Sequence, residues 1–374
     1  MKSLLYIATN PINFDRLGGI EKKILSHCKC FSSNFNTKLI NYSGCYEVTG
    51  DDISVLESYN YKSRFRRFEL FKRALDIAKK DCCNVYIRYP YTDPAFLNLC
   101  RQLKKCGCKI IIEIPTYPYK DNHNHTFFSY LRLWVDTFFS KLLKKYVDRI
   151  VTYSEDKAIF GIGTINTING VDFGKIKIVP LHTNYKEIHL ISAAHLYACH
   201  GYDRVIRGLA NYYLISPQVE VFFHIVGVGE VLDELKLLAS EYNVEKYVIF
   251  HGYLNSEDLD KVYNISDIAV NSLAIHRIGL TTESTLKAKE YCAKGLPVIT
   301  AFELDSLSSG DNKKFTYKVP LNDDPINIME IITFYKNLQE TPNYNVVIRE
   351  KSQRLCDMSQ TLAPIMDYLI HPVE

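Results

Sequence analysis

The sequence predicts an α/β protein made of two doubly wound domains, each built on a parallel β-sheet. Short runs of β-branched and other apolar residues alternate with segments of helical periodicity along most of the chain. The runs are continuously apolar, as expected of strands that are buried on both faces of a parallel sheet. The alternation starts afresh near His189, and 374 residues are enough for two domains with separate cores.

The first series begins at the N-terminus. An apolar run at 4–9 is followed by Asn10 and Pro11, and after a loop Gly18 and Gly19 open a helical pattern. The remaining strands of this series are predicted at 85–88, 109–114 and 149–153, with helices at 96–105 and before 149. We assign residues 1–183 to an N-terminal Rossmann-like domain and expect a C-terminal helix, about 357–374, to pack back on it.

The second series is assigned to a C-terminal Rossmann-like domain at 184–356. Its predicted strands are 189–194, 221–226, 247–250, 267–271 and 296–300, and its predicted helices are 203–214, 230–242, 256–263 and 284–294. Ligands of such sheets bind beyond the carboxyl ends of the strands. Two domains of this kind, facing each other, therefore predict a cleft that holds the ligand.

The segment 276–299, HRIGLTTESTLKAKEYCAKGLPVI, predicts a short helix whose N-terminus binds an anion. Ser284 and Thr285 are candidate N-caps, and Gly295 suits the position after the last turn. Free N–H groups at such a terminus suit a phosphate, while Lys287 and Glu290 lie three residues apart on one face. We expect a phosphate and a sugar hydroxyl to bind side by side there. The alternative, a surface helix with an incidental lysine and glutamate, stays open.

Composition narrows the class of protein. The net charge of +3 is small and no recognisable nucleic-acid motif occurs, so we expect no nucleic-acid partner. The N-terminal run is short and reads as a strand, and no run of eighteen apolar residues suggests a membrane span. The eleven cysteines are scattered without zinc-finger spacing, which favours reduced thiols and a cytoplasmic protein.

Seven short motifs, taken together, resemble those of a known enzyme family. In chain order they are Gly18-Gly19, EIPTYPY at 113–119, NGVD at 169–172, HGYDR at 200–204, VGVGE at 226–230, FHGYL at 250–254 and LKAKEYCAKGLPVI at 286–299. This order resembles the retaining glycosyltransferases of the GT-B fold, family four, and especially bacterial-type enzymes that build surface polysaccharides. The resemblance covers nearly the whole chain. It implies transfer of a sugar from a nucleoside-diphosphate sugar to a glycan or lipid-linked saccharide, with no metal or other cofactor required.

The resemblance also implies roles for residues of the second domain. Members carry two glutamates eight positions apart, and the second binds ribose hydroxyls; Glu290 matches that second position. The first position is taken by Thr282, so the neighbouring Glu283 becomes the candidate. Lys287 and Glu283 are the candidate catalytic residues of this domain. The other candidate donor-binding residues are Gly18, Gly19, Gly227, Gly229, Leu254, Ser284, Thr285 and Leu286.

His195 and His200 replace an arginine and a lysine that members commonly use to bind the diphosphate. Unperturbed histidines are mostly neutral at pH 7, so we expect another cation to compensate. Lys287 and Arg277 are the first candidates and Arg204 is the third. If the histidines contact the diphosphate, the donor KM should fall between pH 8 and 6. The alternative is a pair of loop residues that bind backbone groups.

The acceptor is expected to meet the first domain. Glu113 ends a buried strand before a proline-rich loop, so we expect it to face the cleft and orient an acceptor hydroxyl as a third catalytic residue. Arg88 and Tyr117 are the candidate acceptor-binding residues beside it. His123 and His125 lie in the next loop. A strand-end carboxylate that only caps a loop is the alternative for Glu113.

Two basic, aromatic segments predict peripheral contact with an anionic membrane, at the inner face of the cell membrane. Segment 61–80 carries Arg64, Arg66, Arg67, Lys72 and Arg73 among phenylalanines. Segment 127–147 carries Trp134 and four phenylalanines beside Lys141, Lys144 and Lys145. The alternative is that the aromatic faces pack on the sheet.

Two other functions stay open. A sugar-nucleotide epimerase shares the two-domain architecture, although its catalytic carboxylates and histidines are not evident in this chain. A degenerate transferase that binds a nucleotide sugar without turnover would fit the displaced glutamate and the two histidines.

Overall fold

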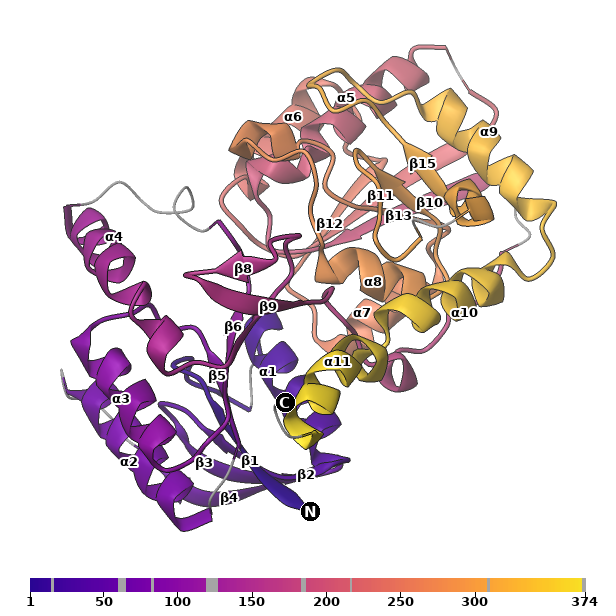
Figure 1. Ribbon diagram of the computed structural model, residues 1–374. Helices are drawn as coiled ribbons and strands as arrows, with labels where there is room; N and C mark the ends of the chain where they lie inside the picture. The colour runs from indigo at the N-terminus through magenta and orange to yellow at the C-terminus, as the bar shows by residue number, and fades with distance from the viewer. Residues whose placement is uncertain are drawn as a thin grey trace. The chain divides into compact units, whose positions relative to one another are not determined.

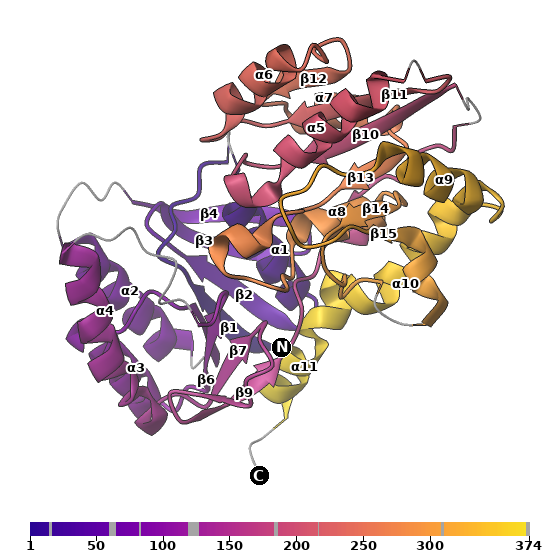
Figure 2. The ribbon, with the colours of Figure 1, turned by 90° about the horizontal axis from the view of Figure 1, so that it is seen from above.

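The computed structural model describes residues 1–14, 17–59, 65–81, 84–118, 127–182, 186–215, 217–307 and 310–371 (Figure 1). The chain forms two compact units. The first unit comprises Met1–Asn169 and Met358–Glu374, and the second comprises Gly170–Asp357. Each has its own sheet, and Figure 2 gives a second view of both.

The first unit is built on a nine-stranded sheet of order β4-β3-β2-β1-β5-β6-β7-β9-β8. Its strands are β1 (Lys2–Ile7), β2 (Phe35–Ile40), β3 (Gly44–Thr49), β4 (Asp52–Ser58), β5 (Asn84–Arg88), β6 (Ile110–Ile114), β7 (Arg149–Thr152), β8 (Ala158–Ile159) and β9 (Ile162–Asn166). Its α-helices are α1 (Gly19–Ser32), α2 (Arg66–Asp81), α3 (Pro94–Lys105), α4 (Phe127–Ser140) and α11 (Met358–Ile370). The central strands run parallel, whereas β3, β4 and β8 pair antiparallel at the edges.

Strand β1 shows why this sheet is covered on both faces. Successive side chains of a strand point to opposite faces. Leu5 and Ile7 accordingly join the core formed with α2 and α3, and Leu4 and Tyr6 join the core formed with α1 and α11. Both faces are therefore apolar, which explains the continuous apolar run in the sequence.

The second unit is built on a six-stranded parallel sheet of order β12-β11-β10-β13-β14-β15. Its strands are β10 (Glu187–Ala193), β11 (Glu220–Val226), β12 (Val248–Gly252), β13 (Ile268–Val270), β14 (Val298–Thr300) and β15 (Thr316–Lys318). Its α-helices are α5 (Tyr202–Tyr213), α6 (Leu232–Glu241), α7 (Ser256–Asn264), α8 (Leu286–Ala293), α9 (Ile328–Gln339) and α10 (Tyr344–Cys356). Numbered within the unit this is the order 3-2-1-4-5-6 of a dinucleotide-binding sheet, so the topology reverses between β10 and β13.

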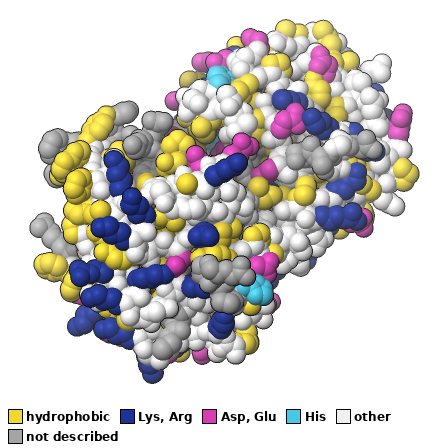
Figure 3. Space-filling model, viewed as in Figure 1, with side chains coloured by type: hydrophobic (Ala, Val, Ile, Leu, Met, Phe, Trp, Pro, Cys, Tyr) yellow, Lys and Arg dark blue, Asp and Glu magenta, His cyan; other side chains and the backbone are white. Residues whose placement is uncertain are grey.

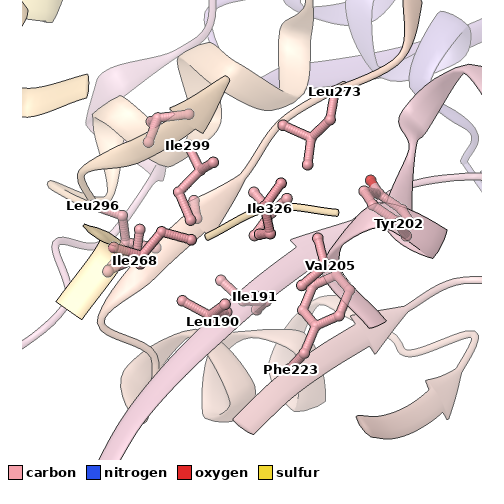
Figure 4. Packing of buried hydrophobic residues seen from close by; sticks show 14 of the residues in the cluster. Leu190, Ile191, Tyr202, Val205, Phe223, Ile268, Leu273, Leu296, Ile299 and Ile326 are labelled. Carbon is pink, nitrogen blue, oxygen red and sulfur yellow. The ribbon is translucent and has the colours of Figure 1, made fainter. Parts of the chain in front are cut away.

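The core of the second unit is centred on β10. Leu190 and Ile191 of that strand are fully buried and lie beside Phe223 of β11, Val205 of α5 and Ile268 of β13 (Figure 4). Because apolar side chains pack on the parallel strands, the loops at the carboxyl ends of these strands are held in fixed positions. The site described below is made of those loops.

The predicted fold class is confirmed, because both series of strands and helices form doubly wound sheets, one parallel throughout and one parallel except at its edges. The units divide at Asn169 and Gly170, fourteen positions before the predicted joint. The reason is that 170–182 is held by the second unit. Val179 lies in its core, the Val179 N–H donates to the Lys294 carbonyl at 2.9 Å, and the Asn345 side chain donates to the Val179 carbonyl at 2.9 Å. The helix α11, predicted at 357–374, belongs to the first unit and packs on α1.

Candidate functional site

The loops that follow β10 and β13 lie against each other at the point where the strand order reverses. The Leu273 N–H donates to the His200 carbonyl at 2.9 Å, and the Ala274 N–H donates to the Cys199 carbonyl at 3.1 Å. Gly201 has φ of +66°, and a Cβ there would lie 2.9 Å from the Ala274 Cβ. Only glycine suits this junction, because it combines a left-handed backbone with close packing.

The N-terminus of α8 is tied to the end of β13. Thr285 caps the helix, since its hydroxyl accepts from the Ala288 N–H at 3.3 Å and donates to the Asn271 side-chain oxygen at 3.2 Å. Ser284, the other predicted cap, donates instead to the Asp305 carboxylate at 2.6 Å. Leu286 is therefore the first helical residue, and the first turn begins beside the β10–β13 junction.

Lys287 reaches toward the loop after β10 from the first turn of α8. Its Nζ lies 3.4 Å from the Tyr202 hydroxyl and 5.7 Å from the centroid of that ring. Burial lowers the pKa of Lys287 to about 7, although the neighbouring Glu283 carboxylate acts in the opposite direction. An ammonium with this pKa is about half charged at neutral pH, and an anion placed against it would favour the charged form.

Glu283 and Glu290 differ in their distance from Lys287 along the chain and in the charges that act on them. Withdrawal from water raises the pKa of the Glu283 carboxyl, and the charges of Lys287 and then Lys289 offset part of that rise. By surface area both side chains are exposed, and Glu290 lies on the surface of α8. Among the predicted residues, Glu283 is thus electrostatically coupled to Lys287, and Glu290 lies three residues further along the helix.

His200 does not behave as the sequence led us to expect. It is buried, and burial lowers the pKa of its imidazole to about 3, with smaller contributions from Lys287 and His195. His200 therefore stays neutral between pH 6 and 8 and supplies no charge to an anion there. His195 is exposed, with its ring centroid 4.7 Å from that of Tyr197.

Arg204 and Arg277, predicted as compensating cations, are held by protein acceptors instead. Arg204 is buried, and its guanidinium donates to the carbonyls of Asp324, Leu273 and Pro320 and to the Asn322 side chain. Arg277 makes two hydrogen bonds of 2.9 Å to the Asp203 carboxylate and one of 2.8 Å to Asp323. These contacts fix the loops that follow β13 and β15 on α5. They favour a structural role for both arginines.

Gly227 and Gly229 are required for the packing of two loops. A Cβ at Gly227 would lie 1.9 Å from the Ala194 carbonyl oxygen, and one at Gly229 would lie 2.2 Å from the Leu196 carbonyl oxygen. Leu196 and Gly229 form an isolated bridge that continues the pairing of β10 with β11. These glycines therefore hold the loop after β11 on the loop that carries His195. Leu254, also predicted to bind the donor, is partly buried against the core.

A buried ion pair beside the site was missed in the sequence. Lys289 has a side-chain exposure of 0%, and its Nζ lies 2.8 Å from both Asp305 oxygens and 2.8 Å from the Ser284 hydroxyl. It thereby holds the residue next to Glu283. The sequence feature that could have revealed this pair is a lysine on the core-facing side of a short helix, between the buried Ala288 and Tyr291.

In the first unit, Glu113 is the centre of a buried charged cluster. Its side-chain exposure is 0%, and its oxygens lie 3.0 Å from Lys23 Nζ and 3.3 Å from Arg88 Nη1. The hydroxyls of Tyr153 and Tyr6 donate to it at 2.7 and 3.2 Å. Burial raises the pKa of Glu113, but the positive charges of Lys23 and Arg88 lower it by more. The net pKa of this carboxyl therefore lies well below the usual range. The structure thus gives Glu113 four partners within its own unit. Its predicted role, orientation of an acceptor hydroxyl, stays a prediction.

The other predicted residues of the first unit are spread along its loops. Arg88 is paired with Glu113, whereas Tyr117 is partly buried and packs its ring edge-on against Phe160, with centroids 6.4 Å apart. Gly18 is the N-cap of α1 and Gly19 is its first residue. His123 and His125 lie outside the described residues. The role of Lys23 was not predicted, because its partner Glu113 is ninety positions away in the sequence.

The described residues were predicted to need no metal, to hold reduced thiols and to lack a membrane span. They contain no group of three or more His, Cys, Asp or Glu placed to hold a metal ion. The cysteines among them are free thiols. None of the helices in the described ranges is both long and apolar enough to cross a membrane.

The residues around this site are similar to a known protein family. Residues 177–302, which hold the β10–β13 junction and all of α8, match the family model described as Glycosyl transferases group 1. No curated protein matches the chain at a significant level. The matched residues lie within the second unit.

Solved structures extend the similarity to the whole chain. A glycosyltransferase from Rickettsia africae ESF-5 is 14% identical with a TM-score of 0.66, and each chain is covered to 100%. Anabaena Alr3699/HepE, solved with UDP and glucose, is 14% identical with a TM-score of 0.66 and 100% coverage of both chains. Sucrose-phosphate synthase from Thermosynechococcus elongatus is 13% identical with a TM-score of 0.63, with 99% of both chains covered. At this identity the likeness shows the fold, so the GT-B architecture predicted from the motifs is confirmed.

Proposed function

We propose that the protein is a retaining glycosyltransferase of family four that transfers a sugar from a nucleoside-diphosphate sugar. The observation that carries the proposal is Lys287, a lysine of depressed pKa in the first turn of α8, beside the β10–β13 reversal. Parallel sheets of this order bind their ligands at that point. The group 1 match covers the same residues.

The chemistry requires stabilisation of a leaving diphosphate. Breaking the anomeric C–O bond places additional negative charge on the nucleotide, and positioned cations and amide dipoles supply the largest single contribution in such reactions. We assign that role to Lys287 and to the N–H groups at the start of α8. Glu290 is assigned to the ribose hydroxyls and Glu283 to the sugar. We name no protein nucleophile, because a departing phosphate oxygen can accept the proton of the incoming hydroxyl when both are held in place.

The acceptor is proposed to be a glycan or a lipid-linked saccharide, in the synthesis of a surface polysaccharide at the cytoplasmic side of the membrane. Support comes from the order of the seven motifs and from a lipopolysaccharide outer core galactosyltransferase, WaaB, among the similar structures, with a TM-score of 0.56. We propose that no metal is required, since diphosphate charge is met here by a lysine and a helix terminus.

Transfer by the purified protein tests the proposal. The full chain is incubated with a panel of nucleotide sugars, with and without saccharide acceptors, and release of nucleoside diphosphate and the anomeric configuration of the product are measured. We expect one donor to be used with retention, and Lys287→Met to lower kcat/KM by on the order of a hundredfold or more. Lys236→Met, an exposed lysine on α6, is the matched control and should leave the rate unchanged.

A second candidate is a degenerate member that binds a nucleotide sugar without turnover. The observation that favours it is the neutral His200 where members carry a cation, together with Thr282 at the first glutamate position. Tight binding with no turnover across the panel would support this candidate. Conversion of the donor sugar to its epimer, with no transfer, would point to an epimerase.

A further inference from the structure

Helix α4 of the first unit buries two polar side chains and exposes its largest aromatic ones. A helix on the surface of a protein in water normally buries its apolar side. Here Asp136 and Ser140 are buried to 1% exposure, whereas Trp134 and Phe138 are 69% and 60% exposed. The alternative in which this aromatic face packs on the sheet is therefore excluded for these side chains.

The orientation of α4 is set by the buried aspartate. The Asp136 carboxylate accepts from the Thr92 N–H at 2.5 Å and from the Tyr89 hydroxyl at 2.6 Å. Both partners belong to the segment between β5 and α3, so α4 is attached to the unit through a polar contact on its inner side. Rotating the helix to bury its aromatic residues would break these hydrogen bonds and expose their partners. The outward direction of Trp134 is therefore built into the fold.

The outward side is a continuous apolar stripe that ends in positive charge. Residues three or four apart lie on one face of a helix, and Tyr130, Trp134 and Phe138 follow that spacing. Leu131 widens the stripe, and the Trp134 and Phe138 rings stack with centroids 6.4 Å apart. Exposed lysines follow at positions 141, 144 and 145. Figure 3 shows hydrophobic side chains along the edge formed by α4, with Lys and Arg side chains beside them.

The charges indicate what covers this stripe. Between 127 and 147 the one acidic residue is Asp136, which is buried, so every exposed charge of the segment is positive. A protein partner would have to present an apolar groove with an acidic rim. An anionic bilayer presents both parts at once, because tryptophan, tyrosine and phenylalanine settle at the boundary of headgroups and chains while lysines meet lipid phosphates.

The other basic aromatic segment, 61–80, gives no comparable surface. Residues 61–64 lie outside the described part of the chain. Within α2, Leu70 and Phe71 are buried in the core, and Arg73 is paired with Glu57. Phe65 and Phe68 are exposed, but no other exposed large hydrophobic residue continues from them among the described residues of α2.

We propose that the outward stripe of α4, defined by Tyr130, Leu131, Trp134 and Phe138 with the three lysines after it, seats the first unit on an anionic lipid surface. This goes beyond the proposed transfer reaction, and the binding itself does not depend on it. In combination with that reaction, it would bring the enzyme to a lipid-linked acceptor.

Trp134 makes the proposal directly measurable, because it is the only tryptophan in the chain. The full protein is mixed with vesicles of phosphatidylglycerol and phosphatidylcholine, or of phosphatidylcholine alone, at low salt. Cosedimentation and the wavelength of tryptophan emission are recorded together. We expect binding to the anionic vesicles with a blue shift of Trp134, and little binding to the neutral ones.

Two variants separate the contributions of charge and apolar contact. Replacing Lys141, Lys144 and Lys145 by Gln should weaken binding to anionic vesicles by on the order of a hundredfold, because each basic residue near the surface contributes about fivefold. Its control changes three exposed lysines of the second unit, at positions 236, 246 and 261, to Gln. Phe138→Ser should lower the partition and the blue shift, while Leu237→Ser, at a 61% exposed leucine of α6, should change neither.

Several outcomes would overturn the proposal. Binding without a shift of Trp134 would place the lipid contact elsewhere, and no binding to anionic vesicles would remove it altogether. A dimer in lipid-free solution that Phe138→Ser dissociates would identify a second copy of the chain as the partner. None of these measurements uses a donor or acceptor, so transfer to a soluble saccharide can succeed or fail independently of them.

Discussion

Lys287 should make donor binding depend on pH between 6 and 8. The protein is titrated with its nucleotide-sugar donor, whose phosphates stay fully ionised over this range, and the dissociation constant is measured at each pH. Because burial lowers the pKa of Lys287 to about 7, the ammonium forms progressively as the pH falls through that value. Binding should therefore tighten toward pH 6.

The size of the effect follows from this pKa. If only the ammonium form binds the diphosphate, the apparent dissociation constant rises with pH as one plus the ratio of neutral to charged lysine. That factor is about 1.1 at one unit below the pKa and about 11 at one unit above it. The constant should thus increase roughly tenfold between pH 6 and 8, equal to about 1.4 kcal/mol of binding free energy.

The assay uses the donor-induced rise in thermal stability, which reports the dissociation constant at each pH. Lys287→Arg is the informative variant, because its guanidinium stays charged throughout and should flatten the profile. Lys287→Met should also give a flat profile, but at weak binding. His200→Asn should leave the slope intact, because the pKa of His200, about 3, lies below the whole range.

Two results would refute this reasoning. A flat profile in the wild type would mean that Lys287 does not meet the diphosphate or does not titrate here. A slope that persists in Lys287→Arg and disappears in a His195 variant would return the role to the exposed histidine.

Three further predictions concern stability, measured by urea unfolding. Gly227→Ala should lower the free energy of unfolding by about 3 kcal/mol, because its Cβ would lie 1.9 Å from a backbone oxygen. Gly252→Ala, at a residue with φ of +66° but open space around it, should lower it by about 1–2 kcal/mol. Equal losses would contradict the close approach at Gly227. Glu113→Ala should cost about 3–5 kcal/mol by leaving Lys23 and Arg88 buried without a carboxylate, against less than about 1 for Glu57→Ala at an exposed pair. Burial lowers the pKa of His224 to about 4, so the folded state resists protonation and loses stability as the pH falls below the unfolded value. The loss from this histidine between pH 8 and 5 should be about 2 kcal/mol, and it should be absent in His224→Phe.

The sequence predicted the sheets well because their determinants are local. Apolar runs alternate with helical patterns along the chain. This alternation is enough to predict parallel strands that are buried on both faces. The position of α8 and its cap at Thr285 followed from short-range capping chemistry. Strands β2, β3, β4, β8, β9 and β15 were not predicted. Strand β4 is almost wholly exposed, so it lacks the burial that marks a strand of the sheet core.

The roles of charged residues were less predictable, since their partners are far away in the chain. Arg277 is paired with residues 74 and 46 positions distant, and Glu113 meets Lys23 across 90 positions. Periodicity shows that a helix has an apolar side, but the direction in which that side points depends on its neighbours. For α4 that direction is set by Asp136 and the Thr92 N–H, 44 positions earlier.

The neutral His200 and the titratable Lys287 are best understood together. Burial lowers the pKa of both, and the two charged forms would repel each other. Without a ligand, Lys287 is therefore about half charged at pH 7 and mostly neutral at pH 8, while His200 is neutral at both. A diphosphate that enters such a site must draw a proton onto Lys287, and its interaction with the resulting ammonium is strong because little water screens it. A site built in this way should discriminate against neutral ligands and should release the nucleotide more readily as the pH rises. Proton uptake on donor binding at pH 8, measured in buffers of different ionisation enthalpy, would be close to one per site if Lys287 is the cation and near zero if it is not.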